Sequence, residues 1–161
     1  FSMFHFRKKV KDCNIYSPII GKMIALENVK DHVFSSKMMG DGCAFEFDGD
    51  TVFAPCNGEI VLIANTKHAI GLKAENGTEI MIHIGLDTVN LNGEGFEVCA
   101  SVHDKVNAHD PLIRINRQIM RNHNIDLTMP MVITNMSDYE VSIQHQENVN
   151  LDHLVMVSKR K

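Results

Sequence analysis

Short hydrophobic runs separated by turn signals at regular spacing are the dominant pattern of the chain. The turn signals are Asn-Gly and Asp-Gly pairs, whose residues suit the positive φ angles of two-residue hairpin turns. They lie at residues 48–49, 57–58, 76–77 and 92–93. The β-prone runs predict strands at residues 44–47, 59–63, 70–74, 79–84, 112–115, 132–135, 141–145 and 154–157. Many short strands with frequent turns predict an all-β, antiparallel sandwich or barrel.

Helical periodicity is confined to one short segment. Ile115, Ile119 and His123 recur four residues apart behind Asn116, a residue type that caps helices well, so we expect a short helix over residues 116–123. A second short turn is expected near residues 28–34. The chain has no internal repeat and no linker. We therefore expect a flexible N-terminal segment, residues 1–14, followed by a single domain over residues 15–161.

Composition narrows the classes of function. The 161 residues are 44% hydrophobic, which is enough for a core, and the net charge of −4 argues against a nucleic-acid partner. No stretch approaches the ~20 apolar residues of a membrane span, so no stable membrane insertion is expected. The four cysteines form no Cys-x-x-Cys pair and are interpreted as free thiols. Together these features favour a cytoplasmic protein, and no cofactor is expected.

The most informative run surrounds His83. Isoleucines at 80, 82 and 84 alternate with Met81, His83 and Gly85, so the imidazole points away from an aliphatic face that belongs in the core. Gly85 lets another group approach closely, or lets the strand bulge and redirect the ring. A lone histidine in this position is more often structural than chemical.

A second histidine strengthens the case for chemistry. His68 precedes the strand that the hairpin at residues 76–77 joins to the His83 strand. Allowing for a bulge, the two imidazoles face one another across paired strands, where opposite Cβ atoms lie ~5 Å apart. Such a pair can bind one metal ion, or one ring can act as a nucleophile while the other hydrogen-bonds its adduct. The spacing alone does not distinguish these alternatives.

Several ordered motifs resemble one family. Residues 83–89, His-Ile-Gly-Leu-Asp-Thr-Val, resemble the active-site signature of the glucose-class enzyme IIA domain of the bacterial phosphoenolpyruvate:sugar phosphotransferase system. Residues 66–69 resemble that family's second histidine segment. Further matches, in the same order and spacing, lie at residues 40–42, 54–60, 93–96 and 130–135, and the similarity covers about residues 15 to 157. The resemblance implies the fold of that family, a single-domain sandwich like the duplicated hybrid motif, with one or two short helices.

The resemblance also implies a phosphocarrier that works together with enzyme I, HPr and the IIB and IIC domains of a sugar permease. By this resemblance His83 accepts a phosphoryl group from phospho-HPr, as a phosphohistidine, and passes it to the cysteine of a IIB domain. His68 stabilises the phosphoryl group, and Thr66 orients His68. The backbone carbonyl of Gly85 is expected to fix the tautomer of His83, which leaves the far ring nitrogen free to attack.

Partner contacts are implied in the same way. Two acidic residues are expected to meet basic residues of partners, and an apolar group is expected to surround the active depression. The acids are Asp31 and Asp87, and the apolar residues are Phe34, Met38, Met39 and Ile70. Methionine suits a surface that binds unlike partners because its side chain repacks easily. No metal is required, but zinc at an interface between His68, His83 and a partner stays open, as do regulatory protein targets.

Two other functions compete with this interpretation. A zinc hydrolase could use the two histidines as ligands, but residue 85 is glycine, so the His-x-His pair of related peptidases is missing, and no general base stands out. A lipoyl-type or biotinyl-type carrier module would explain hairpins at residues 54–61 and 104–112. Such modules are about half this length, and they need an exposed lysine at a hairpin tip, which residues 129–131 lack.

Overall fold

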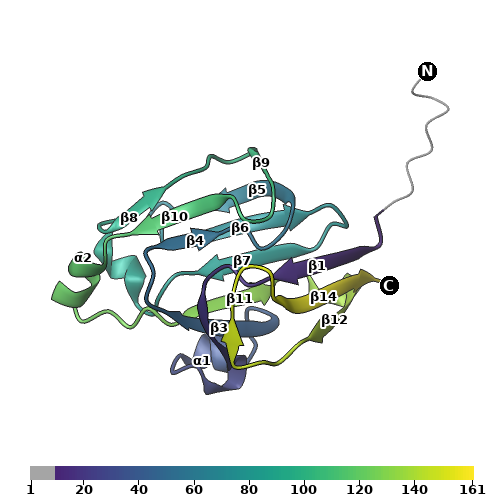
Figure 1. The fold of residues 1–161 in the computed structure, drawn as a ribbon, viewed down its shortest axis with the longest axis horizontal. Coiled ribbons are helices and arrows are strands. Elements are labelled where there is room, and N and C mark those ends of the chain that lie inside the picture. Colours follow the sequence, from purple (N-terminus) through teal and green to yellow (C-terminus); the bar gives the residue numbers. More distant parts are fainter. Residues whose placement is uncertain (1–9) are drawn as a thin grey trace.

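The computed structural model describes residues 10–161, which form three sheets (Figure 1). One sheet has eight strands in the order β13-β2-β3-β11-β7-β6-β5-β9, and two have three strands each, β1-β14-β12 and β4-β10-β8. Each of the strand pairs recorded in these sheets is antiparallel, as the sequence predicts. The strands are β1 (Asp12–Tyr16), β2 (Gly21–Ala25), β3 (Asp41–Phe47), β4 (Thr51–Phe53), β5 (Gly58–Ile63), β6 (Ala69–Ala74), β7 (Glu79–His83), β8 (Phe96–Val98), β9 (Lys105–Val106), β10 (Pro111–Ile115), β11 (Met129–Ile133), β12 (Tyr139–Ile143), β13 (Asn148–Val149) and β14 (Leu154–Arg160).

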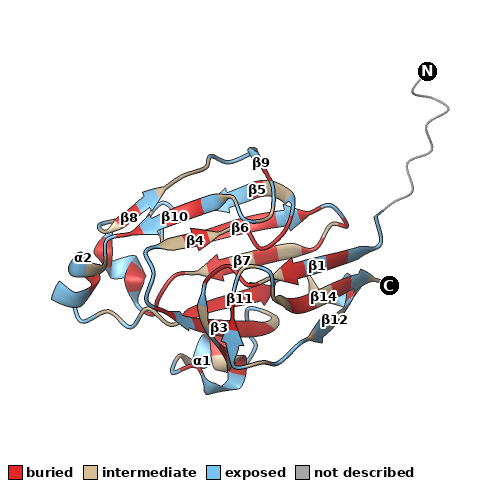
Figure 2. Cartoon of the chain, viewed as in Figure 1, coloured by how far each residue is buried: buried red, intermediate tan, exposed pale blue. Residues whose placement is uncertain are grey.

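One hydrophobic core is shared by all three sheets, and Figure 2 shows the buried positions running through the strands. It includes Ile15 from β1, Ile113 from β10 and Ile82 from β7, which belong to three different sheets. The eight-stranded sheet is open, because its end strands β13 and β9 each have one neighbour among the described residues. The sandwich is therefore confirmed, and the barrel alternative is wrong.

Each of the eight predicted runs overlaps an observed strand, but the run near residue 132 was displaced. It was expected at residues 132–135, and β11 instead spans Met129–Ile133, with all five residues buried. Pro130 obscured its start, because proline is typical of edge strands and not of a central one. The short strands β1, β2, β4, β8, β9 and β13 were not predicted.

The hairpin between β6 and β7 has a three-residue loop and not the two-residue turn that its Asn-Gly pair predicts. The backbone N–H of Gly77 donates to the carbonyl of Ala74 at 2.9 Å, and Ala74 N–H donates to Thr78 at 2.8 Å. Gly77 takes a positive φ of 91°, the left-handed position that follows the first turn in such loops. The buried Asn76 side chain instead makes hydrogen bonds to Lys11, Thr78 and Ser158.

Two short α-helices are present, with three 3-10 helices, among residues 10–161. The predicted helix over residues 116–123 is observed as α2 (Arg117–Asn122), capped by Asn116, whose Oδ1 accepts from Ile119 N–H at 3.2 Å. The expected turn near residues 28–34 contains the start of α1 (His32–Ser35), capped by Asp31, whose Oδ1 accepts from Val33 N–H at 2.9 Å. The 3-10 helices are η2 (Leu26–Asn28), η3 (Thr88–Leu91) and η4 (Met136–Asp138).

The N-terminal expectation needs a correction. Residues 12–14 were assigned to a flexible segment, but Asp12, Cys13 and Asn14 pair with β14 as part of β1. Strand pairing with β14 and burial of Cys13 fix this part of the chain. Residues 1–9 of that segment lie outside the described residues. Within residues 10–161, no helix has the length and apolar character needed to cross a membrane.

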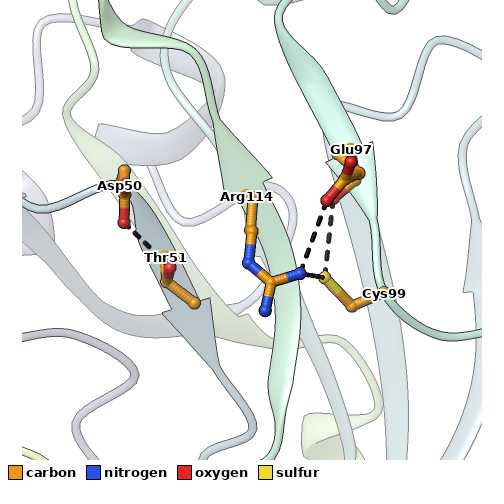
Figure 3. A network of polar contacts seen from close by, with 5 residues as sticks. All are labelled: Asp50, Thr51, Glu97, Cys99 and Arg114. Atoms are coloured by element: carbon orange, nitrogen blue, oxygen red, sulfur yellow. Dashed lines mark hydrogen bonds and ion pairs between the residues drawn. The ribbon is translucent and has the colours of Figure 1, made fainter.

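One face of the β4-β10-β8 sheet carries a group of polar side chains (Figure 3), of which Glu97 and Arg114 are exposed. Arg114 on β10 lies between Thr51 and Glu97 in the strand register. Its Nη1 lies 3.4 Å from Glu97 Oε1 and 3.3 Å from the Cys99 Sγ. All four cysteines are free thiols, in agreement with the prediction, and three are buried while Cys99 is partly exposed.

Candidate functional site

His83 is the last residue of β7, and its imidazole lies on the face predicted by the alternation. Ile80 and Ile82 are buried, whereas Met81 and His83 on the opposite face are partly exposed. The chain leaves the strand at Ile84 and turns at Gly85, which has a φ of 80°. The Gly85 carbonyl oxygen thereby comes within 2.9 Å of His83 Nδ1. Because a carbonyl oxygen only accepts hydrogen bonds, Nδ1 carries the proton of the neutral ring, and Nε2 has the free lone pair.

His68 reaches the same place from the neighbouring strand, one residue out of the expected register. The cross-strand partner of His83 is Ala69, and His68 lies just before β6 begins. Lys67 has a left-handed φ of 60° in the turn before it, and the His68 carbonyl accepts from Ile84 N–H at 2.7 Å. The two ring centroids are 4.7 Å apart, with the ring planes at 73°. The predicted meeting of the two imidazoles is therefore observed.

Thr66 holds the far side of the His68 ring. Its Oγ1 lies 2.5 Å from His68 Nδ1, a contact in which the hydroxyl can donate or accept. When the hydroxyl donates, His68 carries its proton on Nε2. Thr66 and Gly85 thus each engage the Nδ1 atom of one histidine and leave the corresponding Nε2 uninvolved in these bonds.

Burial favours the neutral form of both rings. It lowers the pKa of His83, and the nearby His68 lowers it further, while the hydrogen bond to Gly85 and the charge of Asp31 act in the opposite direction. Burial also lowers the pKa of His68. Since the ordinary histidine pKa is about 6.5, both imidazoles are predominantly neutral at pH 7.

The predicted apolar surround is only partly on the surface. Met38 and Met39 are 72% and 39% exposed, so they are available to a partner. Phe34 is buried at 4% exposure, but its ring lies against His83, with the centroids 4.9 Å apart. Ile70 is 1% exposed and pairs with Ile82 inside the sheet. The expectation that Ile70 contacts partners is therefore corrected: its side chain fills the core.

Two exposed apolar residues beside the site were not foreseen. Val33 lies on α1 next to Phe34, and Val89 lies on η3, two residues after Asp87; they are 43% and 49% exposed. Their signal in the sequence was only their position next to residues that the motif identified. Together with Met38 and Met39, they supply four exposed apolar side chains on the segments that carry the predicted partner-binding residues.

The two predicted acids line one hollow of about 490 Å³. Asp31 is close enough to His83 to raise its pKa, and Asp87 is exposed, with a left-handed φ of 58°. Asp126 lines the same hollow and was not predicted, whereas Lys30 contributes one positive charge. The hollow therefore suits a basic side chain. A larger hollow, about 970 Å³, lies beside α2 and the β3–β4 turn, and neither of these two hollows is lined by His68 or His83.

No group of three or more His, Cys, Asp or Glu side chains in the part of the chain that the structure describes is arranged to hold a metal ion. His68 and His83 together offer two imidazoles, and zinc sites in proteins almost always have at least three protein ligands. Zinc at this pair would therefore need ligands from a partner.

Comparison with known proteins places most of the chain in one family model. Residues 13–139 match the model of a family described as the phosphoenolpyruvate-dependent sugar phosphotransferase system, EIIA 1. The chain is also similar to the solved structure of the glucose permease IIA from Mycoplasma capricolum. That similarity has a TM-score of 0.83 and 33% sequence identity, over 96% of this chain and 99% of that chain.

A second solved structure resembles the chain more weakly. It is the catalytic domain of the antimicrobial peptidase lysostaphin from Staphylococcus simulans, with a TM-score of 0.42 and 16% identity, over 79% of this chain and 83% of that chain. A likeness of this size supports no conclusion about fold or function.

Proposed function

The chain belongs to the EIIA 1 family of the phosphoenolpyruvate-dependent sugar phosphotransferase system, and we propose that it carries the phosphoryl group on Nε2 of His83. In this proposal HPr is the donor, and the cysteine of a IIB domain is the acceptor. The observation that carries the proposal is the bond between His83 Nδ1 and the Gly85 carbonyl, with the His68 ring 4.7 Å away.

The first step requires a neutral imidazole with an accessible lone pair. Burial lowers the pKa of His83, and the Gly85 carbonyl holds the proton on Nδ1, so Nε2 is the nucleophile. A bond forms between Nε2 and phosphorus as the bond between phosphorus and its carrier atom on HPr breaks. Nδ1 keeps its proton throughout, so the phosphorylated ring becomes a cationic imidazolium.

The same proton prepares the second step. A cationic imidazolium is a good leaving group, because it departs as a neutral ring when the N–P bond breaks. The IIB cysteine attacks phosphorus as a thiolate and forms the S–P bond, and His83 returns to its starting tautomer. The Gly85 carbonyl accepts the hydrogen bond from Nδ1–H before phosphorylation and, in this proposal, also after it, so no other acid or base is needed at this ring.

His68 is suited to holding the phosphoryl oxygens. Its ring lies edge-on to the His83 ring at 73°, and Thr66 engages its Nδ1 at 2.5 Å. With the threonine hydroxyl donating to Nδ1, His68 presents an Nε2–H donor. Phosphoryl transfer depends mainly on positioning and on stabilising the charge of the transferred group, and such a donor supplies both.

The surroundings suit two successive protein partners. Exposed apolar side chains at Met38, Met39, Val33 and Val89 offer an adaptable contact surface, since methionine in particular repacks easily. Asp31 and Asp87 line a hollow that fits a basic side chain of HPr or of a IIB domain. Binding to these partners implies that the protein works in the cytoplasm, as one phosphocarrier domain.

The proposal is tested by incubating the protein with enzyme I, HPr and phosphoenolpyruvate, followed by a search for acid-labile, base-stable phosphate. We expect wild type to take up one phosphate and His83→Ala to take up none. The exposed His145→Ala is the matched control and should behave as wild type. Uptake of label by His83→Ala would refute the assignment of the acceptor.

The role of His68 needs a separate readout. His68→Gln should still accept phosphate from HPr but should transfer it to a IIB domain slowly, because a flexible amide N–H replaces the imidazole donor that Thr66 orients. We expect the transfer rate to fall by roughly 100-fold, the usual scale for losing one preorganised donor that stabilises developing charge. Transfer at the wild-type rate would remove the proposed role of His68.

A further inference from the structure

The five residues Ile84 to Thr88 form a closed loop behind the His83 ring. The Thr88 side chain is fully buried, and its hydroxyl donates to the Ile84 carbonyl at 2.7 Å. Its methyl group lies over Gly85: a Cβ placed on that glycine would come within 2.6 Å of Thr88 Cγ2. The two branches of the threonine side chain therefore face Ile84 and Gly85, the two residues that follow His83.

The Gly85 carbonyl and the Leu86 N–H belong to one planar peptide unit, and that N–H donates to the Asp126 carbonyl at 2.8 Å. The preceding unit carries the Ile84 carbonyl, which the Thr88 hydroxyl holds, and Ile84 N–H donates to the His68 carbonyl at 2.7 Å. Rotation about the Gly85 backbone, between these two units, would move the Gly85 oxygen away from His83 Nδ1. The Gly85 φ of 80° makes this region readily adjustable, because glycine has no side chain that limits its backbone.

We propose that Thr88 is a positioning residue, which acts through the Gly85 carbonyl to keep the His83 proton on Nδ1 and Nε2 free for phosphorus. This inference rests on the proposed function of His83 as the phosphoryl acceptor. Thr88 does not touch the reacting atoms. Its hydroxyl fixes the Ile84 carbonyl, its methyl group limits the movement of Gly85, and the Gly85 oxygen then stays 2.9 Å from His83 Nδ1.

The residue type fits this role at both branches. Serine would keep the hydroxyl and lose the methyl group, whereas valine would keep the shape and lose the donor. Since Thr88 is fully buried, water cannot readily replace the lost donor at the Ile84 carbonyl. Thr88→Val should therefore loosen the loop, and Thr88→Ser should retain most of its geometry.

The test measures the His83 ring in the unphosphorylated protein, by NMR of ¹⁵N-labelled imidazole. In wild type and in Thr88→Ser we expect the neutral ring to carry its proton on Nδ1. In Thr88→Val we expect a clear population of the other tautomer. The Gly85 bond raises the pKa of His83, so the pKa of His83 should fall further in Thr88→Val, because the opposing effects of His68 and Asp31 on it are not altered by the substitution. We also expect phosphate acceptance from HPr to slow by about tenfold, the lower end of the scale seen when an outer hydrogen-bond partner of a metal-bound imidazole is removed.

A merely structural role would give a different result. It would lower the thermal stability of both variants and would leave the tautomer and the pKa of His83 as in wild type, and that outcome would overturn the inference. If Thr88→Val does not fold, the hydrogen bond is tested in wild type: a slowly exchanging Thr88 hydroxyl proton with a scalar coupling to the Ile84 carbonyl carbon supports it. A rapidly exchanging hydroxyl without this coupling would overturn it.

These readouts keep the two proposals separate. The tautomer and the pKa are measured without HPr, so they report on Thr88 whether or not His83 is phosphorylated. A shifted tautomer in Thr88→Val, together with a wild-type protein that takes no phosphate on His83, would refute the proposed function alone. An unchanged tautomer in Thr88→Val, together with a wild-type protein that is phosphorylated on His83, would refute the inference about Thr88 alone.

Discussion

Replacement of Asn76 by alanine is predicted to be among the most destabilising changes at a polar residue. The Asn76 side chain is fully buried and makes four hydrogen bonds. Its Nδ2 donates to the carbonyls of Lys11 at 3.1 Å and Ser158 at 3.0 Å. Its Oδ1 accepts from the Thr78 backbone N–H at 3.0 Å and from the Thr78 hydroxyl at 2.7 Å. The side chain thus ties the β6–β7 hairpin to β14 and to Lys11, the residue before β1.

The magnitude follows from these contacts. A typical hydrogen bond contributes about 1 kcal/mol net, and each buried partner left unsatisfied costs about 1–3 kcal/mol. The Thr78 hydroxyl keeps a partner in Ser158, with the two hydroxyl oxygens 2.8 Å apart, so part of the network survives. We therefore expect Asn76→Ala to lower the free energy of unfolding by about 4 kcal/mol.

The assay is urea denaturation of Asn76→Ala and of Asn57→Ala, followed by circular dichroism. Asn57 is the matched control: it also precedes a glycine, but it is exposed and accepts one bond, from Ala108 N–H at 2.8 Å. Asn57→Ala should cost less than about 1 kcal/mol. Equal midpoint shifts in the two variants, with the same denaturant slope as wild type, would refute the reasoning. His83 lies six residues after Gly77, at the far end of β7 and up to about 20 Å away at ~3.3 Å per residue, so folded Asn76→Ala should still accept phosphate.

Three further predictions concern the site itself. Burial lowers the pKa of His83 and of His68 in the folded protein, so the unfolded chain binds more protons below pH ~6.5. The free energy of unfolding should therefore fall as the pH drops from ~6.5 through the folded pKa. Urea titrations at several pH values should show a weaker pH dependence for His83→Asn than for wild type. Asp31→Asn keeps an oxygen that can cap α1 and removes the charge, so it should raise the KM for phospho-HPr severalfold at low salt while the melting temperature stays within about 2 °C of wild type; an unchanged KM would contradict a role in docking. Thr66→Val should slow transfer to a IIB domain to a similar extent as His68→Gln, and Thr66→Ser should restore it; normal transfer by the valine variant would show that His68 needs no orienting hydroxyl.

The strand pattern was predictable wherever alternation and turn residues agree. The His83 strand is the best case, because Ile80 and Ile82 face the core and His83 faces outward, as their spacing indicates. Prediction failed where burial removes the alternation: all five residues of β11 are buried, and one of them is Pro130. It also failed for the Asn76 loop, because the bonds that shape this loop go to Lys11 and Ser158, far away in the sequence.

The site was predictable in its identities and less so in its geometry. The motif identified His68, His83 and Thr66, and the structure brings all three together. The one-residue offset of His68 arises from the left-handed turn at Lys67. Residues other than glycine rarely adopt a positive φ, so the sequence does not predict this turn. Whether an apolar residue near the motif is on the surface depends on packing, which is why Ile70 was misplaced while Met38 and Met39 were not.

The central claim is that phosphorus binds Nε2 of His83. It is tested most directly by phosphorylating ¹⁵N-histidine-labelled protein with enzyme I, HPr and phosphoenolpyruvate, and by recording the coupling between ³¹P and the ring nitrogens. We predict a single phosphohistidine, at residue 83, with phosphorus coupled to Nε2 and the proton still on Nδ1, bonded to Gly85. A phosphoryl group on Nδ1 of His83, or on any other side chain, would contradict the account.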